Sequence, residues 1–219
     1  MPGTPTKELL IKEELFILSA CRAVYWPAQK MLILADLHLG KTGYFRQHGI
    51  PVSRDVLQDD LKRLSYLIGQ FEPEQVLVAG DLFHHQFNRD ILVFNEWRNA
   101  YRQLAFLLVP GNHDRHLKID YSSLAITKTT EEYFVKEFRF IHEMKAAHED
   151  HFSISGHLHP GYTIKGKARQ AVCLPCFINA EDYLILPAFS GFTGLFTGYE
   201  QQSGAAYFVI SGESLFEFR

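Results

Sequence analysis

The sequence has little of several features that would each indicate a special class of protein. Its 219 residues include only three cysteines, Cys21, Cys173 and Cys176, an odd and sparse set that argues against a disulfide framework and for a reducing compartment. No apolar run approaches the roughly 18 residues that cross a bilayer, and the polar start does not resemble a signal peptide. We therefore expect a soluble, cytoplasmic protein with no membrane partner.

The chain also lacks an excess of charge of one sign. Its formal net charge is −3 and its pI is near 6.4, so no global basic field indicates nucleic-acid binding, and a polyanion would have to be bound locally. In contrast, 47% of the residues are hydrophobic, which is enough to bury a full core. No repeat, linker or low-complexity stretch divides the chain. We expect a single domain over residues 1–219.

The order of apolar segments predicts a layered fold. In the first part, strands alternate with helices that begin near Ser53, a good N-cap, and near Arg89. The strands expected there are 15–18, 22–26, 31–35, 75–79 and 104–109. The later strands expected are 138–141, 152–155, 171–177, 183–186, 205–210 and 214–218. This pattern indicates an α/β (α+β layered) fold of two packed β-sheets flanked by helices, with the functional site where strands end.

Polar residues with metal-binding side chains gather directly after apolar strands, in five blocks. These are Asp36-Leu37-His38, Gly80-Asp81, Gly111-Asn112-His113-Asp114, Ile141-His142-Glu143 and Gly156-His157-Leu158-His159. A lone histidine at a strand end is usually only a hydrogen-bonded residue, but an ordered set indicates a metal site. In the first and last blocks the donors are two residues apart, so extended backbone would point both side chains the same way, toward one ion.

The chemistry of the donor atoms limits which metals the site could bind. Imidazole nitrogens and carboxylate oxygens without thiolate suit manganese, iron, zinc, cobalt or nickel better than calcium. Two such ions about 3.5–4 Å apart could clamp the attacking and leaving oxygens of a phosphoryl displacement and acidify the water between them. A carboxylate has to lie between the ions, and Asp81 is the candidate. We expect two divalent ions, with manganese the first choice.

The five blocks, in this order and spacing, resemble the calcineurin-like metallophosphoesterase superfamily, whose pattern runs D-x-H, GD, GNH-[D/E], H, GH-x-H. The resemblance implies two ligand sets that share Asp81. The first set is Asp36, His38, Asp81 and His159, and the second is Asp81, Asn112, His142 and His157. It also implies that His113 donates to the phosphate or leaving oxygen, while Asp114 orients its ring. His84 stands where this family often has an Asp behind the ligands.

A narrower resemblance covers nearly the whole chain. Residues 22–27, 36–41, 157–161, 174–177, 186–189 and 192–194 are similar to the ligase-associated DNA damage response phosphoesterases. The resemblance implies a role in DNA repair beside an ATP-dependent DNA ligase, a helicase and an exonuclease.

Basic residues follow the first and last blocks. Lys41 and Arg46 come after the first, and Lys165, Lys167 and Arg169 after the last, so together they could form a local basic rim for DNA phosphates. For each one alone, a position on a plain solvated loop is the slightly favoured interpretation.

Three further features have two interpretations each. His84 and His85 either approach the metals or lie on a solvated loop. We expect the Cys173 and Cys176 pair to serve packing rather than redox chemistry. Residues 191–198 could present Phe192 and Phe196 as a base-stacking edge, but we favour an irregular core strand.

The sequence therefore predicts hydrolysis of a phosphodiester, with DNA as the expected substrate of an endonuclease or end-processing enzyme. Two alternatives stay open. The same chemistry could act on a nucleotide, a cyclic nucleotide or another small phosphodiester, because the metal blocks do not specify the ester. The fold could also serve as a scaffold without turnover, although the presence of His113 argues against this.

Overall fold

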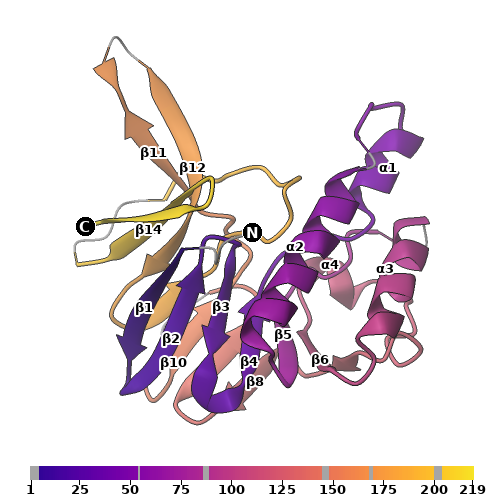
Figure 1. Ribbon diagram of the computed structural model, residues 1–219, viewed down its shortest axis with the longest axis horizontal. Coiled ribbons are helices and arrows are strands. Elements are labelled where there is room, and N and C mark those ends of the chain that lie inside the picture. Colours follow the sequence, from indigo (N-terminus) through magenta and orange to yellow (C-terminus); the bar gives the residue numbers. More distant parts are fainter. Residues whose placement is uncertain (1–4, 54, 86–88, 145–147, 168–169, 200–203) are drawn as a thin grey trace.

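The computed structural model consists of two β-sheets packed face to face, with helices on the outer side of the first sheet (Figure 1). It describes residues 5–53, 55–85, 89–144, 148–167, 170–199 and 204–219. The predicted architecture of two sheets flanked by helices is confirmed. Among the described residues, no helix combines the length and apolar character needed to span a bilayer.

Seven strands within the described residues form the first sheet, in sequence order from edge to edge. They are β1 Thr6–Ile11, β2 Glu14–Ser19, β3 Ala23–Trp26, β4 Met31–Leu34, β5 Gln75–Ala79, β6 Ala105–Val109 and β7 Thr127–Lys128. Strands β1 to β4 pair antiparallel, whereas β4 to β7 pair parallel. The helical segments are η1 Pro27–Gln29, α1 Lys41–Gln47, α2 Asp55–Phe71, α3 Arg89–Ala100 and α4 Asn112–Arg115.

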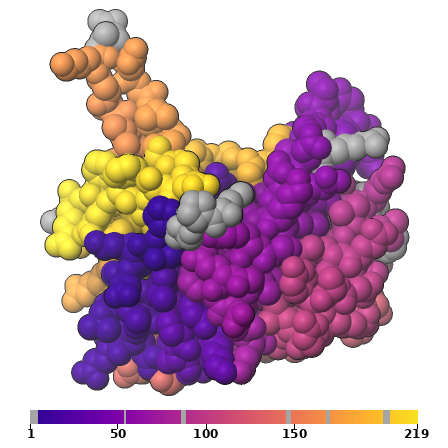
Figure 2. Space-filling model, in the orientation of Figure 1, coloured from indigo at the N-terminus to yellow at the C-terminus, as the bar shows by residue number. Residues whose placement is uncertain are grey.

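The second sheet has the order β15-β14-β12-β13-β10-β9-β8. Its strands are β8 Glu132–Val135, β9 Phe138–Ile141, β10 Phe152–Ser155, β12 Ala171–Asn179, β13 Tyr183–Ile185, β14 Ala206–Ser211 and β15 Ser214–Phe218. A further strand, β11 (Gly161–Lys165), pairs only with β12. The β11–β12 hairpin rises from the body of the molecule on the same side as α1, and Figure 2 shows a hollow between them.

The cores follow from the alternation of side chains along buried strands. On β4, Leu32 and Leu34 pack toward α2 and α3, while Met31 and Ile33 face the second sheet. Helix α2 covers the first sheet with one face, because Leu57, Leu61, Leu64 and Leu67 recur at helical spacing and are all buried. The core between the sheets contains several aromatic side chains, among them Phe16, Trp26, Phe138 and Phe140.

Some elements do not follow from sequence pattern. Strand β1 lies in a segment that was interpreted as a polar start, and it joins β2 through Lys12 and Glu13, both with positive φ. A hairpin turn of this kind normally carries glycine or asparagine, so its sequence signal is absent. Helix α1 and strand β11 were also not predicted.

The prediction of an irregular core strand at residues 191–198 is wrong. This segment forms a loop in which Phe196 makes only an isolated bridge to Pro160. The side chain of Phe196 is 47% exposed.

Candidate metal centre

All five blocks converge at one edge of the molecule, where strands of both sheets end. The loops after β4, β5 and β6 carry Asp36 and His38, Asp81, and Asn112, and those after β9 and β10 carry the remaining histidines. Because β4, β5 and β6 are parallel to one another, and β9 is parallel to β10, their carboxyl ends meet. The five blocks, which are spread over residues 36–159, therefore contribute to one site.

One cluster contains the first predicted ligand set. The Nε2 atoms of His38 and His159 lie 3.2 Å apart, and His159 Nε2 lies 3.6 Å from Asp36 Oδ1. The distance from His38 Nε2 to Asp81 Oδ2 is 4.0 Å. Ligand atoms of Asp36, His38 and His159 all fall within 4.8 Å of one another, a spacing at which they could hold one cation.

A second cluster surrounds the Nε2 atom of His142. It lies 2.9 Å from Asn112 Oδ1, 3.0 Å from His157 Nδ1 and 3.4 Å from Asp81 Oδ2. These four residues are the second predicted set. Asp81 Oδ2 is the atom common to both clusters, which gives Asp81 the central position expected of a shared ligand.

The donor atoms fit divalent cations. Asp36 Oδ1 is buried and has no hydrogen-bond partner in the part of the chain that the structure describes, whereas Asp36 Oδ2 accepts the backbone N–H of His157. Burial lowers the pKa of His38 to about 2, which keeps its ring neutral. Burial raises the pKa of Asp81, but interactions with His142 and His38 outweigh it, and the pKa falls to about 2. Neutral imidazole and ionised carboxylate are the forms that bind metals.

The backbone reaches this geometry in an unexpected way. The paired donors do converge, but not from extended backbone, because Asp36, His38, His157 and His159 all have positive φ, between 47° and 69°. Asp81 is also left-handed, at 48°. Left-handed conformation is uncommon for residues with a Cβ and costs energy, so these residues hold a strained arrangement that surrounding contacts maintain. The prediction of extended pairs is wrong at both blocks.

Glycines ahead of the ligands leave room for ligands of other blocks. Gly80 has φ +89°, and a Cβ built there would lie 2.0 Å from Nδ1 of His142. At Gly111 a Cβ would lie 2.1 Å from Oδ1 of Asp81. At Gly156 it would lie 2.6 Å from Oδ2 of Asp36. Each distance is shorter than any real Cβ contact, so these positions exclude a side chain.

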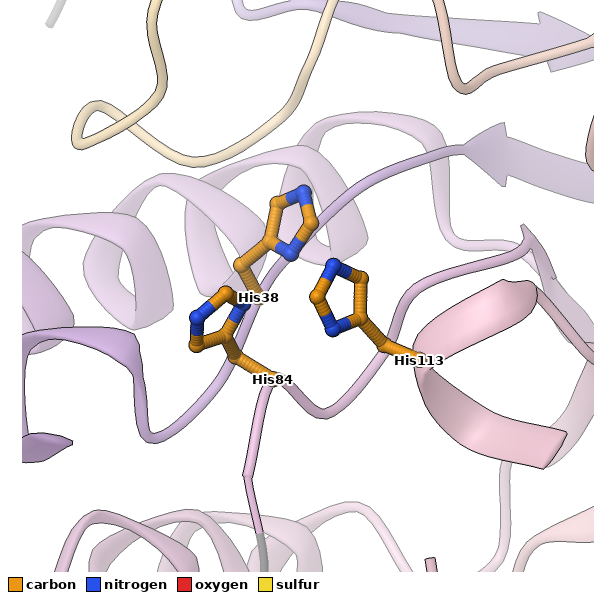
Figure 3. Close-up of side chains that lie close together, drawn as sticks. All are labelled: His38, His84 and His113. Carbon is orange, nitrogen blue, oxygen red and sulfur yellow. The ribbon is translucent and has the colours of Figure 1, made fainter. Parts of the chain in front are cut away.

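His113 lies at the rim of the site. Its side chain is 33% exposed, and its Nε2 is 3.9 Å from Asp81 Oδ2. Its own backbone N–H donates to Asp81 Oδ1, at 3.0 Å, which ties the start of α4 to the central carboxylate. A cluster of three imidazoles, His38, His84 and His113, forms one wall (Figure 3).

The resemblance implies that Asp114 binds the ring of His113, but the structure gives it other partners. Its buried carboxylate accepts the backbone N–H groups of Leu82, Phe83 and Gly111, at 3.0–3.2 Å. Burial raises its pKa to about 6, against the lowering effect of those donors. No hydrogen bond joins it to the His113 ring among the described residues. Asp114 therefore fixes the loops that carry Asp81 and Asn112, one step removed from the reacting groups.

His84, which was left out of the predicted ligands, belongs to the site. Its ring centroid lies 4.5 Å from that of His113, and burial lowers its pKa to about 4. Its position three residues after Asp81 is the one sequence feature that indicates a place in the site. A loop can carry a residue at that distance either toward the ligands or away from them. His85 instead lies against Tyr44 of α1, with ring centroids 4.8 Å apart.

The predicted basic rim divides into three groups. Lys41 is half-buried at the start of α1 and close enough to Asp36 and Asp81 to interact with both charges. Arg46 does not join the predicted ligands, because its guanidinium pairs with Asp90 at 3.3 Å and donates to the carbonyls of Val52 and Ser53. Lys165 and Lys167 are exposed on the projecting hairpin, and Arg169 lies outside the described residues.

The two cysteines of the pair form no disulfide. Cys173 is exposed and Cys176 is buried, both as free thiols, and burial raises the pKa of Cys176 to about 12. Its Sγ lies 3.7 Å from the hydroxyl of Tyr199. These surroundings agree with the packing role expected for Cys176.

The chain matches one family model and several solved structures of other proteins. The family model described as Calcineurin-like phosphoesterase matches residues 29–174, about two thirds of the chain. Among solved structures, the nuclease MPE of Pseudomonas putida matches with a TM-score of 0.83 and 27% identity, over 98% of this chain and 100% of that one. The phosphoesterase Yfce of E. coli matches with a TM-score of 0.46 and 13% identity, over 86% of this chain and 97% of that one, which is too weak to support an inference. No curated protein matches.

Proposed function

Because this chain belongs to the calcineurin-like phosphoesterase family, we propose that it is a two-metal phosphodiesterase that cleaves DNA. Family membership confirms the predicted class of enzyme, a metal-dependent phosphoesterase. The observation that carries the two-metal proposal is the pair of ligand clusters that meet at Asp81 Oδ2, 4.0 Å from His38 Nε2 and 3.4 Å from His142 Nε2.

The residues have separate tasks in this proposal. Asp36, His38, Asp81 and His159 would hold one ion, and Asp81, Asn112, His142 and His157 the other. Two bound divalent ions, manganese by preference, would supply Lewis acidity to the phosphate and lower the pKa of an attacking water. His113, at the open rim, donates a hydrogen bond to the phosphate or to the departing oxygen. Lys41 places a positive charge beside that position.

DNA as the substrate has independent support. A solved structure that is similar to 98% of this chain, at 27% identity, is that of a nuclease. Figure 2 shows a hollow between α1 and the β11–β12 hairpin, and the hairpin region carries the exposed residues Lys165 and Lys167. Exposed lysines beside a hollow suit a polyanion such as DNA, because phosphates are bound largely through Lys and Arg.

The cellular setting is also part of the proposal. Action in the cytoplasm, in a repair pathway with an ATP-dependent DNA ligase, a helicase and an exonuclease, rests on the narrower sequence resemblance. Free thiols at Cys21, Cys173 and Cys176 are compatible with a reducing compartment. Affinity purification of the chain from its host after DNA damage tests these partners, and recovery of none of the three would remove them.

Hydrolysis assays with a matched pair of histidine variants test the activity. His113→Ala removes the donor at the rim, whereas His116→Ala removes an exposed histidine at the C-cap of α4. We expect manganese-dependent cleavage of a chromogenic phosphodiester by wild type and His116→Ala, and a loss of roughly 100-fold or more in His113→Ala. Chelation should abolish all activity.

A substrate panel separates the alternatives. Single-stranded, nicked, flapped and duplex DNA are compared with nucleotides and cyclic nucleotides. Cleavage of nucleotides without cleavage of any DNA would replace the proposed substrate. Absence of metal-dependent hydrolysis in wild type would favour a scaffold.

A further inference from the structure

The segment that carries His159 is hydrogen-bonded to the loop that carries Phe196. The backbone N–H of Phe196 donates to the carbonyl of His159, and the N–H of Gly161 donates to the carbonyl of Phe196, both at 2.9 Å. These two bonds form the bridge between Phe196 and Pro160. Phe196 is therefore fixed in position relative to a metal-binding histidine, although it lies in a loop.

The ring of Phe196 is supported from behind and open in front. A Cβ built at Gly198 would lie 2.8 Å from Cζ of Phe196, so the ring rests against the glycine and only glycine leaves it this space. Tyr199 lies at its edge, with ring centroids 6.4 Å apart. Even so, 47% of Phe196 is exposed to solvent.

The loop around Phe196 runs between the two sides of the hollow. At one end Phe192 packs edge-on against Phe45 of α1, with ring centroids 5.6 Å apart, and at the other Phe196 lies at the base of the hairpin. Residues 151–180 and 183–199 contain no aspartate or glutamate. The loop of Phe196 and the strands of the neighbouring hairpin thus carry an open aromatic ring and exposed lysines, and they contain no acidic residue within 183–199 or 161–179.

We propose that Phe196 stacks on an unpaired nucleobase of the DNA substrate close to the scissile phosphate. The inference rests on the proposed nuclease function and adds to it a residue that positions the strand. Aromatic side chains beside a basic track are the usual means of holding unpaired bases, because every base has a π-face. Within a duplex both faces of a base are already stacked, so this contact requires a base that is out of the helix.

The test combines protein variants with abasic substrates. A single-stranded oligonucleotide with one defined cleavage site is prepared intact and with single abasic sites at each position flanking that bond. Wild type, Phe196→Ala and Phe196→Trp are compared, with Phe216→Ala as the control. Phe216 lies on the edge strand β15 and is similarly exposed, at 51%.

We expect Phe196→Ala to lower kcat/KM on the intact oligonucleotide by roughly tenfold, since stacking on one base typically contributes this much or more. Phe196→Trp should retain the wild-type value, and Phe216→Ala should not differ from wild type. One abasic position should reduce cleavage by wild type about as much as the alanine substitution does. That position should cause no further reduction in Phe196→Ala.

Two contrary outcomes are distinguishable. If wild type cleaves the oligonucleotide but every abasic penalty is the same in wild type and Phe196→Ala, the stacking contact is wrong and the nuclease function stands. Failure of wild type to cleave any oligonucleotide would remove the nuclease function, and this inference with it.

Discussion

The two sides of the candidate metal centre differ in how deeply they are buried. Asp36, His38, Asp81 and His142 are at most 5% exposed, and they are enclosed by strand ends from both sheets. In contrast, the side chains of His113 and His157 are 33% and 40% exposed, and they line the opening. The buried side is built to fix the ligands before a substrate arrives, while the open side is where a substrate can be contacted and exchanged.

This difference makes distinct predictions for the two sides. Substitutions on the buried side should change metal content or the stability of the fold, because their neighbours have no solvent to replace a lost contact. On the open side, substitutions should change kinetics and leave the fold intact.

The largest effect should come from Asp81→Asn, which weakens the carboxylate whose Oδ2 lies close to both His38 and His142. We expect activity to fall by about a thousandfold or more, since each ion contributes several kcal/mol to the reaction. Metal analysis should find fewer than two ions per chain. Asp120→Asn, in an exposed turn, serves as the control. A variant of Asp81 that keeps two ions and wild-type turnover would rule out the shared ligand.

The second-largest effect should come from Asp114→Ala, and it should be a loss of stability. Three buried backbone N–H groups lose their acceptor, and we expect the free energy of unfolding to fall by about 3 kcal/mol. Urea denaturation measures this change. Asp120→Ala removes a carboxylate that accepts comparable bonds from Ser122 and Ser123 on the surface, and it should cost far less. Equal losses in the two variants would show that burial is not what makes Asp114 important.

His157→Ala should have an intermediate effect. Because this ligand is at the solvent edge, water can take its place, so we expect a loss of about ten- to a hundredfold that high manganese concentration partly restores. His38→Ala, on the buried side, should not be restored in this way. Activity titrated against manganese gives the comparison, and the same metal dependence in both variants would abolish the distinction between the two sides.

The smallest effect should come from the hairpin. Replacing Lys165 and Lys167 by alanine should weaken DNA binding only a few-fold at moderate salt, because exposed phosphate contacts are individually weak. The slope of log affinity against log salt should become shallower by about 1.4 for single-stranded DNA. Lys12 and Lys62, both exposed elsewhere, are the matched double substitution. An unchanged slope would mean that the hairpin does not touch the backbone of the strand.

Sequence pattern predicted much of this molecule for identifiable reasons. Strands such as β4 and β5 are apolar on both faces and end two residues before an aspartate, so their positions and the site edge follow directly. Helix α2 was evident from its apolar spacing. The two ligand sets followed from family resemblance, and the clusters around His38 and His142 agree with them.

What sequence pattern missed depends on backbone conformation and tertiary contact. Nothing in Asp36-Leu37-His38 indicates left-handed backbone, because that conformation is imposed by contacts such as the N–H of Leu39 with the carbonyl of Leu82. Arg46 was expected near the metals, but Asp90, distant in sequence, binds it elsewhere. His84 entered the site through the course of a loop that no periodic pattern describes.

The three glycines beside the ligands have a consequence for how this centre can change over time. Gly80 makes space for His142, Gly111 for Asp81 and Gly156 for Asp36, so each block accommodates a donor from a different block. No block can be altered or transplanted independently of the one whose side chain it receives. Evolution or engineering of a new coordination set on this scaffold would have to replace residues in coordinated pairs, one member at a glycine and the other on a distant strand.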